Sequence, residues 1–280
     1  MRRALRQIPL LSDIFRVVRD SLVRFQKPRL SKDGFMFIGN DQIISGEYEP
    51  EVKSFLYQVI GKFSTFVNIG ANHGYYLCLA TKLGFKNVIG VEPLIQNVRV
   101  LRRNLAINNF GSAKIVRSAC GSPKDSSVVL FGSGTGASTQ KGWGGAKSKI
   151  KRTVSIIALD SLVGIDDGPC VFVIDVEGYE NKVLEGAGNL LKRKSDVWFV
   201  EISFYENSPD GSMNPDALKI FRLFAESGFE AYAWIPTLRK IVVNDARDLD
   251  QFANIFHMFL FARRNSDRDN FLEFLESEIQ

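Results

Sequence analysis

The sequence predicts an α/β fold built on a doubly wound, mostly parallel sheet. Apolar, β-prone runs alternate with stretches of helical periodicity from Phe66 onward, which is typical of strands joined by right-handed helical crossovers. The run 66–69 leads into a glycine-containing bend, and the run 87–91 leads into the carboxylate of Glu92. A chain of 280 residues with 45% apolar side chains can bury one large core. We therefore expect a single domain over residues 31–265, with an extension at each end.

The first thirty residues form the expected N-terminal extension. Between Leu10 and Phe25, apolar side chains recur at helical spacing while arginines fall elsewhere on the wheel, which predicts a basic amphipathic helix ending at Pro28. Two interpretations stay open: the helix docks on the domain's own surface, or it contacts an anionic membrane face. Most of the formal net charge of +5 comes from the basic residues here, namely Arg2, Arg3, Arg6, Arg16, Arg19, Arg24, Lys27 and Arg29.

Two short elements are expected before the first long strand. Residues 35–38 and 43–44, joined by the turn 39–42, predict a small β-hairpin. A helix follows from Glu49 to Ile60, with Pro50 at its start, where a missing N–H is tolerated.

Two crossover helices and a series of further strands complete the predicted fold. The helix Tyr75–Leu83 stops at Gly84, and the helix from Ile95 to Asn108 is closed by Gly111. Further strands are expected at 113–116, 127–131, 153–157, 171–175, 197–202, 230–235 and 255–262. Residues 266–280 predict a short C-terminal surface helix.

The stretch 131–151 is rich in glycine and serine and is the least core-like part of the chain. No Gly-Lys-Ser/Thr opens a helix after it, which excludes a phosphate-binding P-loop. We expect a mobile loop. The alternative is a lid over an acceptor, with Trp143 stacking on a sugar and Lys141 or Lys147 meeting phosphate.

The cysteine and histidine content limits the chemistry. Cys78, Cys120 and Cys170 are odd in number and widely spaced in apolar contexts, which favours buried, reduced thiols in a cytoplasmic protein. Only His73 and His257 supply imidazoles. A multi-histidine metal site and most histidine-based hydrolase sites are therefore disfavoured, and we predict no metal.

Membrane-spanning and secretory segments are not predicted. No apolar run approaches the roughly twenty residues of a spanning helix. Pro9, Asp13 and Arg16 interrupt what would be the apolar core of a signal peptide. We expect a cytoplasmic protein. The alternative is a cytoplasmic protein that contacts a membrane peripherally through residues 1–30.

The bend after Phe66–Ile69 is the first candidate binding site. Without a Cβ, Gly70 and Gly74 allow a ligand to approach the main chain closely. The dinucleotide fingerprint G-x-G-x-x-G is not met, because Ala71 and Asn72 stand where its second glycine would fall. An adenosyl group without phosphate, as in S-adenosylmethionine, suits this bend better, and a carboxylate after the next strand can accept bonds from ribose hydroxyls. A purely structural turn is the alternative.

Three motifs together resemble the FkbM-type S-adenosylmethionine-dependent methyltransferases, from about Glu47 to about Glu201. In that family the first motif usually opens with Asp and has an aliphatic residue before its second glycine, whereas this chain has Asn68 and His73. We expect the uncharged Asn68 to affect cofactor affinity rather than cofactor identity. The motifs are Asn68-Ile-Gly-Ala-Asn-His-Gly-Tyr-Tyr, Gly90-Val-Glu-Pro, and Ile174-Asp-Val-Glu-Gly-Tyr-Glu with Val183-Leu-Glu-Gly-Ala.

The resemblance implies a Rossmann-like class I methyltransferase fold. The last two predicted strands, 230–235 and 255–262, would then form the antiparallel C-terminal pair of that fold. The segment Gly46–Pro50 also resembles a family element that lies over the cofactor, although Pro50 is equally well explained by helix capping.

Cofactor and acceptor residues are expected at the carboxyl ends of the strands. Asp175 ends one buried strand, Glu177 follows it closely, and Glu201 ends the next strand, so all three are candidate catalytic groups, with Asp175 as general base. The alternative for Glu177, and for Glu180, is to cap the following helix. The predicted cofactor-binding residues are Asn68, Gly70, Ala71, Asn72, Gly74, Glu92, Ser118, Ala119 and Asp175.

The sequence therefore predicts an S-adenosylmethionine-dependent methyltransferase, and the resemblance implies O-methylation of a sugar, glycan or other small hydroxylated metabolite. An NAD-dependent oxidoreductase is disfavoured by the missing third glycine. A non-catalytic binding module that uses its basic N-terminus on a membrane is the other alternative. No nucleic-acid partner is expected, because no recognisable nucleic-acid motif is present.

Overall fold

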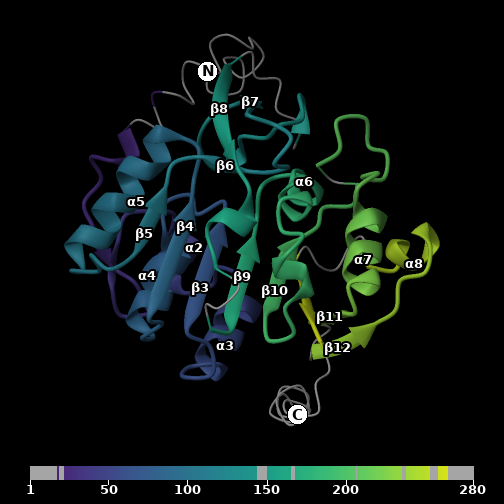
Figure 1. Cartoon of the computed structure of the whole chain (residues 1–280). Helices are drawn as coiled ribbons and strands as arrows, with labels where there is room; N and C mark the ends of the chain where they lie inside the picture. Colours follow the sequence, from purple (N-terminus) through teal and green to yellow (C-terminus); the bar gives the residue numbers. More distant parts are fainter. Residues whose placement is uncertain are drawn as a thin grey trace.

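The structure is a computed structural model that describes residues 18, 22–143, 150–164, 168–205, 207–234, 238–252 and 258–263. Its described part contains a central sheet of eight strands in the order β12-β11-β13-β10-β9-β3-β4-β5 (Figure 1). The predicted α/β class is confirmed. The strands are β3 (Thr65–Ile69), β4 (Asn87–Val91), β5 (Lys114–Val116), β9 (Cys170–Ile174), β10 (Val197–Glu201), β11 (Glu230–Trp234), β12 (Leu238–Ile241) and β13 (Met258–Ala262).

Most of the sheet is parallel, and its C-terminal edge is not. β5, β4, β3, β9 and β10 pair in parallel. β13 pairs antiparallel with both β10 and β11, as the resemblance implied. β12 was not predicted, and it pairs antiparallel with β11 at the edge of the sheet.

Helices cover both faces of the sheet. The helices are α2 (Asp41–Ser45), α3 (Pro50–Gln58), α4 (Tyr75–Lys82), α5 (Ile95–Ile107), α6 (Glu180–Glu185), α7 (Ala217–Glu226) and α8 (Ala246–Asp250), with short 3-10 turns at Gly134–Gly136, Leu159–Ser161 and Leu190–Lys192. The core residues of α3, α4 and α5 pack on one face, and those of α6 and α7 pack on the other. The predicted helices 49–60, 75–83 and 95–108 thus correspond to α3, α4 and α5.

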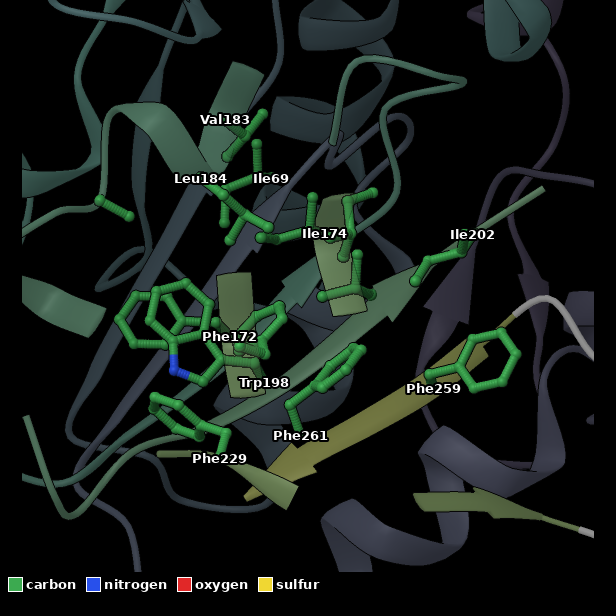
Figure 2. Packing of buried hydrophobic residues seen from close by; sticks show 14 of the residues in the cluster. Ile69, Phe172, Ile174, Val183, Leu184, Trp198, Ile202, Phe229, Phe259 and Phe261 are labelled. Atoms are coloured by element: carbon green, nitrogen blue, oxygen red, sulfur yellow. The ribbon is translucent and has the colours of Figure 1, made fainter. Parts of the chain in front are cut away.

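Buried strands alternate their side chains between the two layers. In β9, Val171 and Val173 join the core under α3 and α4, whereas Phe172 and Ile174 join the core under α6 and α7. Figure 2 shows this second layer, in which Phe172 stacks on Trp198 with ring centroids 4.0 Å apart. Such strands are apolar on both faces, which is why they read as continuous hydrophobic runs in the sequence.

A separate three-stranded sheet contains two strands that were expected to extend the main sheet. β6 (Ala119–Cys120) and β7 (Ser127–Phe131) flank β8 (Lys151–Ile157), parallel and antiparallel respectively. Figure 1 shows this sheet above the ends of β3 and β4. The side chains of β8 alternate between exposed and half-buried positions, so one covered face is sufficient and the strand does not need the interior of the main sheet.

The predicted hairpin over residues 35–44 is wrong in its second strand. β2 (Met36–Phe37) pairs instead with β1 (Arg29–Leu30). Residues 43–44 lie in the helix α2, because the Asn40 side chain accepts a hydrogen bond from the Ile43 N–H and so caps the helix start. A two-residue apolar run is too short to distinguish the two structures.

The predicted terminal helices fall largely outside the described residues. Of the N-terminal helix, residues 18 and 22–23 are described, and they are helical. Residues 266–280 lie outside the described part, so the domain boundaries remain predictions. None of the helices in the described ranges combines the length and the apolar character that crossing a bilayer requires.

Candidate active site

A pocket opens at the carboxyl ends of the parallel strands, beside β3. The sheet order turns at this strand, since β3 lies between β4 and β9, and doubly wound sheets bind ligands at such a point. The space in and in front of this pocket is about 630 Å³, which includes open solvent at its mouth. Its lining includes Gly70, Asn72, Glu92, Ser118, Ala119, Asp175 and Glu177, all of them predicted site residues.

Gly70 allows the chain after β3 to lie directly against the chain after β9. Its φ is 87°, and a Cβ at this position would lie 1.7 Å from the carbonyl oxygen of Asp175. The Gly70 N–H donates to Val91 O at 3.0 Å, so the bend is fixed on its other side as well. Only glycine fits such a contact and such a φ without strain.

Glu92 follows β4 and is held by three donors. Its Oε2 accepts from the Asn72 N–H at 2.9 Å, and its Oε1 accepts from the Leu94 N–H at 2.9 Å and from Asn97 Nδ2 at 3.2 Å. Burial raises the pKa of Glu92 to about 7, against the opposing effect of these bonds, and the charge of Asp175 adds to the rise. The carboxylate is thus fixed in place, with lone pairs left for ligand hydroxyls.

Asn72 links the bend to the pocket. Its φ of 48° is in the left-handed region that Asn tolerates better than most residues. Its Oδ1 is buried and has no hydrogen-bond partner in the described structure. A buried acceptor without a partner is costly unless a ligand satisfies it. This side chain therefore fits a donor group, such as a ligand ammonium or hydroxyl.

Two carboxyl groups meet at the ends of β9 and β10. Ile174 pairs in register with Val200, so the next residues, Asp175 and Glu201, stand side by side. Burial raises the pKa of Glu201 well above its ordinary value, and the charge of Asp175 and a hydrogen bond to it add to the rise. In this pair the Glu201 carboxyl donates the hydrogen bond and an Asp175 oxygen accepts it.

Glu177 accepts two hydrogen bonds from the segment that follows β7. Trp143 Nε1 donates to Glu177 Oε2 at 3.0 Å, and Ser138 Oγ donates to Glu177 O at 2.6 Å. Burial raises the pKa of Glu177 to about 7, helped by the charge of Asp175 and opposed by the Trp143 bond. Trp143 is 3% exposed and packs against Gly178, where a Cβ would lie 2.8 Å from its ring. In this structure its ring is part of the packing and does not form an open sugar platform.

Glu180 fulfils the capping alternative, whereas Glu177 does not. Glu180 Oε1 accepts from the Gly178 N–H at 3.0 Å and from the Val176 N–H at 3.4 Å, at the start of α6. The φ of Glu177 is 56°, a conformation that a non-glycine residue adopts at a cost and that clusters at functional sites.

The sequence did not single out a group of side chains that lies against the acids. The phenols of Tyr48 and Tyr76 donate to the carboxylate of Glu49. Burial raises the pKa of Glu49 to about 7, and the charge of Asp175 adds to the rise. Its φ of 38° is again in the left-handed region. Two signals in the sequence cover this group. The segment Gly46–Pro50, which resembles a family element, contains Tyr48 and Glu49, and the first family motif, Asn68–Tyr76, ends at Tyr76.

Other predicted site residues make structural contacts, and Asn68, Ala71 and Gly74 do not line the pocket. The Asn68 side chain is buried and donates to Val173 O at 3.3 Å, across to β9. Gly74 begins α4, and a Cβ there would meet Leu101 at 2.8 Å. Ala71 is 4% exposed. Ser118 lines the pocket, but its Oγ donates to Ser155 O at 2.7 Å.

Metal ligands do not converge in this part of the chain. No group of three or more His, Cys, Asp or Glu side chains among the described residues could hold a metal ion. The three cysteines are buried, and none of them forms a disulfide bond in the described residues.

The methyltransferase FkbM domain matches residues 68–231 of the chain. This match spans more than half of the 280 residues and includes the bend, Glu92 and the Asp175–Glu201 pair. The chain belongs to the FkbM methyltransferase family. A comparison with curated proteins finds no match for this FkbM-family chain.

Solved structures that resemble this FkbM-family chain include other methyltransferases. A methyltransferase FkbM from Methylobacillus flagellatus KT shares 14% identity with a TM-score of 0.43, covering 89% of this chain and 60% of that one. An O-methyltransferase from Bacillus cereus in complex with SAH shares 13% identity with a TM-score of 0.42, covering 78% of this chain and 82% of that one. A putative O-methyltransferase from Klebsiella pneumoniae shares 12% identity with a TM-score of 0.43, covering 90% of this chain and 89% of that one. This chain thus spans about 60% of the length of the M. flagellatus protein.

Proposed function

We propose that the chain transfers a methyl group from S-adenosylmethionine to an oxygen of a sugar or other small hydroxylated metabolite. The observation that carries this proposal is the pocket beside β3, which is lined by the fixed carboxyl group of Glu92 and by Asp175, the neighbour of Glu201. A ligand with a ribose and a cationic centre fits that distribution of charge. Membership in the FkbM family supports the reaction class.

Within this proposal the chain's own residues bind and orient the cofactor. The backbone from Gly70 to Asn72 faces the methionine end, and the unpartnered Asn72 Oδ1 accepts from its ammonium group. Glu92 accepts from the ribose hydroxyls, and the segment Ser118–Ala119 borders the adenine. When bound, the cofactor supplies an electrophilic methyl group on a sulfonium cation.

Asp175 acts as the general base for the acceptor hydroxyl. Asp175 lines the pocket and accepts a hydrogen bond from Glu201, and its carboxyl group has further lone pairs for the proton of the acceptor hydroxyl. The Glu201 hydrogen bond also fixes the orientation of the Asp175 carboxylate. Glu177 positions the segment containing Ser138 and Trp143 over this end of the pocket.

Cofactor binding tests the proposal first. Equilibrium dialysis of the full chain against labelled S-adenosylmethionine should show saturable binding, and a parallel titration with reduced nicotinamide cofactor should show none. Mass spectrometry of polar extracts incubated with the chain and methyl-labelled cofactor then identifies the methylated product. Folded protein that retains no S-adenosylmethionine at millimolar excess, or that binds the nicotinamide cofactor in its place, overturns the proposal.

A further inference from the structure

Positive charge is concentrated in two stretches of the sequence. Residues 93–159 contain eleven basic residues and one acidic residue, and residues 1–30 contain eight basic and two acidic residues. Because the whole chain carries a formal charge of only +5, the rest is strongly acidic. Such an asymmetry predicts an anionic partner for one side of the molecule.

The structure gathers several of these arginines on one surface. α5 presents Arg99 and Arg102 to solvent, and no carboxylate of the described residues forms an ion pair with either. The start of α5 also borders a hollow of about 770 Å³ that is lined by Arg117, Arg152 and Leu94. Leu94 lines the cofactor pocket as well, so the arginines lie beside the pocket mouth.

The N-terminal segment adjoins this basic surface. Arg103 of α5 donates to the backbone oxygen of Arg24, and Figure 1 shows the first described residues, in purple, beside α5. The Arg24 guanidinium lies 4.6 Å from the centroid of the Phe25 ring. The arginines of α5 and the N-terminal segment are therefore parts of one continuous surface.

Apolar side chains of the N-terminal segment are exposed on this surface. Val18 is 50% exposed, Leu22 54% and Phe25 67%. Their spacing of four and three residues places them on one face of a helix. Of these three residues, Val18 and Leu22 are helical and Phe25 lies in the turn that follows. None of the three side chains is buried against the domain. An apolar stripe flanked by arginines is typical of helices that lie in a membrane interface.

We propose that the stripe Val18, Leu22 and Phe25, together with Arg24, Arg99 and Arg102, docks the chain on an anionic lipid bilayer. The arginines contact lipid phosphates, and the apolar side chains enter the boundary between head groups and acyl chains. An anionic bilayer explains both halves of the surface, because a nucleic acid would match the arginines but leave the apolar stripe in water. The pocket mouth then lies next to the bilayer surface.

A dye on the stripe tests this docking. The native cysteines Cys78, Cys120 and Cys170 are at most 2% exposed, so a Phe25→Cys variant can be labelled selectively with a polarity-sensitive fluorophore. Its emission should rise and shift to the blue with phosphatidylcholine vesicles that contain phosphatidylglycerol, and not with phosphatidylcholine alone. A Val242→Cys variant is the matched control, because Val242 is 63% exposed and follows β12, which Figure 1 shows at the opposite end. Its emission should stay unchanged.

Charge variants separate the electrostatic contribution. Arg99→Gln and Arg102→Gln should each weaken sedimentation with the anionic vesicles about fivefold, whereas Arg222→Gln on the exposed face of α7 should not. Replacing Val18, Leu22 and Phe25 by serine should abolish vesicle binding while the thermal midpoint stays unchanged. Absence of vesicle binding, equal binding to neutral vesicles, or binding that survives the serine replacements overturns the proposal. Tight binding of an oligonucleotide in place of vesicles, without a change in the Phe25→Cys emission, assigns the basic surface to nucleic acid. Cofactor binding is measured separately, so either proposal can fail alone.

Discussion

The two ends of the pocket hold buried carboxyl groups in opposite ways. At one end, Glu92 is held by three N–H donors, from Asn72, Leu94 and Asn97. At the other end, Asp175 and Glu201 face each other, with Glu49 and Glu177 close enough for the charge of Asp175 to raise the pKa of each. A carboxyl group that is held by three donors is suited to bind a ligand through its remaining acceptor positions. Carboxyl groups that face each other must share protons, which is suited to proton transfer.

The two ends also differ in how far apart in the sequence their residues lie. The Glu92 end is built from two backbone amides and one side-chain amide, which follow β3 and β4 within residues 72–97. The acid end gathers residues from three distant segments, which meet only after the sheet has formed. Each variant below affects one end, or the joint between them.

Gly70→Ala should have the largest effect, because Gly70 joins the two ends. The added Cβ would lie 1.7 Å from Asp175 O. The backbone at Gly70 and at Asp175 would have to separate, which disrupts the packing of the surrounding core. We expect a loss of roughly 4 kcal/mol in the free energy of unfolding, with both cofactor binding and turnover lost. Thermal and urea unfolding measure the loss. Gly188→Ala is the control, since nothing lies within 4 Å of its added Cβ. Equal stability of the two variants would show that Gly70 does not lie this close to Asp175.

Asp175→Asn affects the acid end alone. The amide cannot accept the acceptor's proton, so turnover should fall by about 10²–10⁴-fold, while the dissociation constant of S-adenosylmethionine changes only a few-fold. Single-turnover kinetics and calorimetric titration separate the two quantities. Asp125→Asn, at an exposed position, is the matched control. Loss of cofactor binding with an unaltered single-turnover rate would show that Asp175 is a binding group.

Glu92→Gln affects the other end. A glutamine keeps one acceptor oxygen but turns an NH₂ group toward either the Asn72 or the Leu94 N–H, and it removes the charge that attracts ribose hydroxyls. We expect cofactor affinity to fall about 10-fold to 100-fold, with a much smaller change in the rate of the bound complex. Calorimetric titration with S-adenosylhomocysteine measures the affinity. An affinity equal to that of the unaltered chain would remove Glu92 from the cofactor site.

Glu177→Gln tests the pH dependence of the acid end and should have the smallest effect. Burial raises the pKa of this carboxyl from 4.5 to about 7, so the folded chain holds the proton more tightly than the unfolded chain. The resulting stabilisation is complete below about pH 4.5 and is lost as the pH rises to about 7. The variant should therefore lose less stability than the unaltered chain between pH 5 and pH 7.5, by on the order of 1–2 kcal/mol. Its side-chain oxygen can still accept from Trp143.

Urea unfolding at the two pH values measures this difference, with Glu226→Gln on the surface of α7 as the control. Identical pH profiles for the unaltered chain and Glu177→Gln would show that Glu177 takes up no proton on folding.

The strands and crossover helices could be predicted because each is dictated by its own residues. β9 is a run of five buried apolar residues, and α5 has its apolar side chains on one face, so local periodicity was sufficient. Local periodicity failed at residues 43–44, where capping by the Asn40 side chain overrode a short apolar run. It predicted β7 and β8 as strands, but not the separate sheet that they form with β6. Pairing partners are chosen by the packing of distant segments, which no single window of sequence contains.

The sequence by itself determined which residues end the buried strands, and therefore that a glycine bend, Glu92, Asp175 and Glu201 would lie at one edge of the sheet. Only the tertiary structure decided that Trp143 holds Glu177, that Tyr48 and Tyr76 donate to Glu49, and that Val18, Leu22 and Phe25 are exposed. Strand ends are fixed by local burial and by the parallel direction of the chain, whereas contacts between segments far apart in sequence depend on how the finished layers pack.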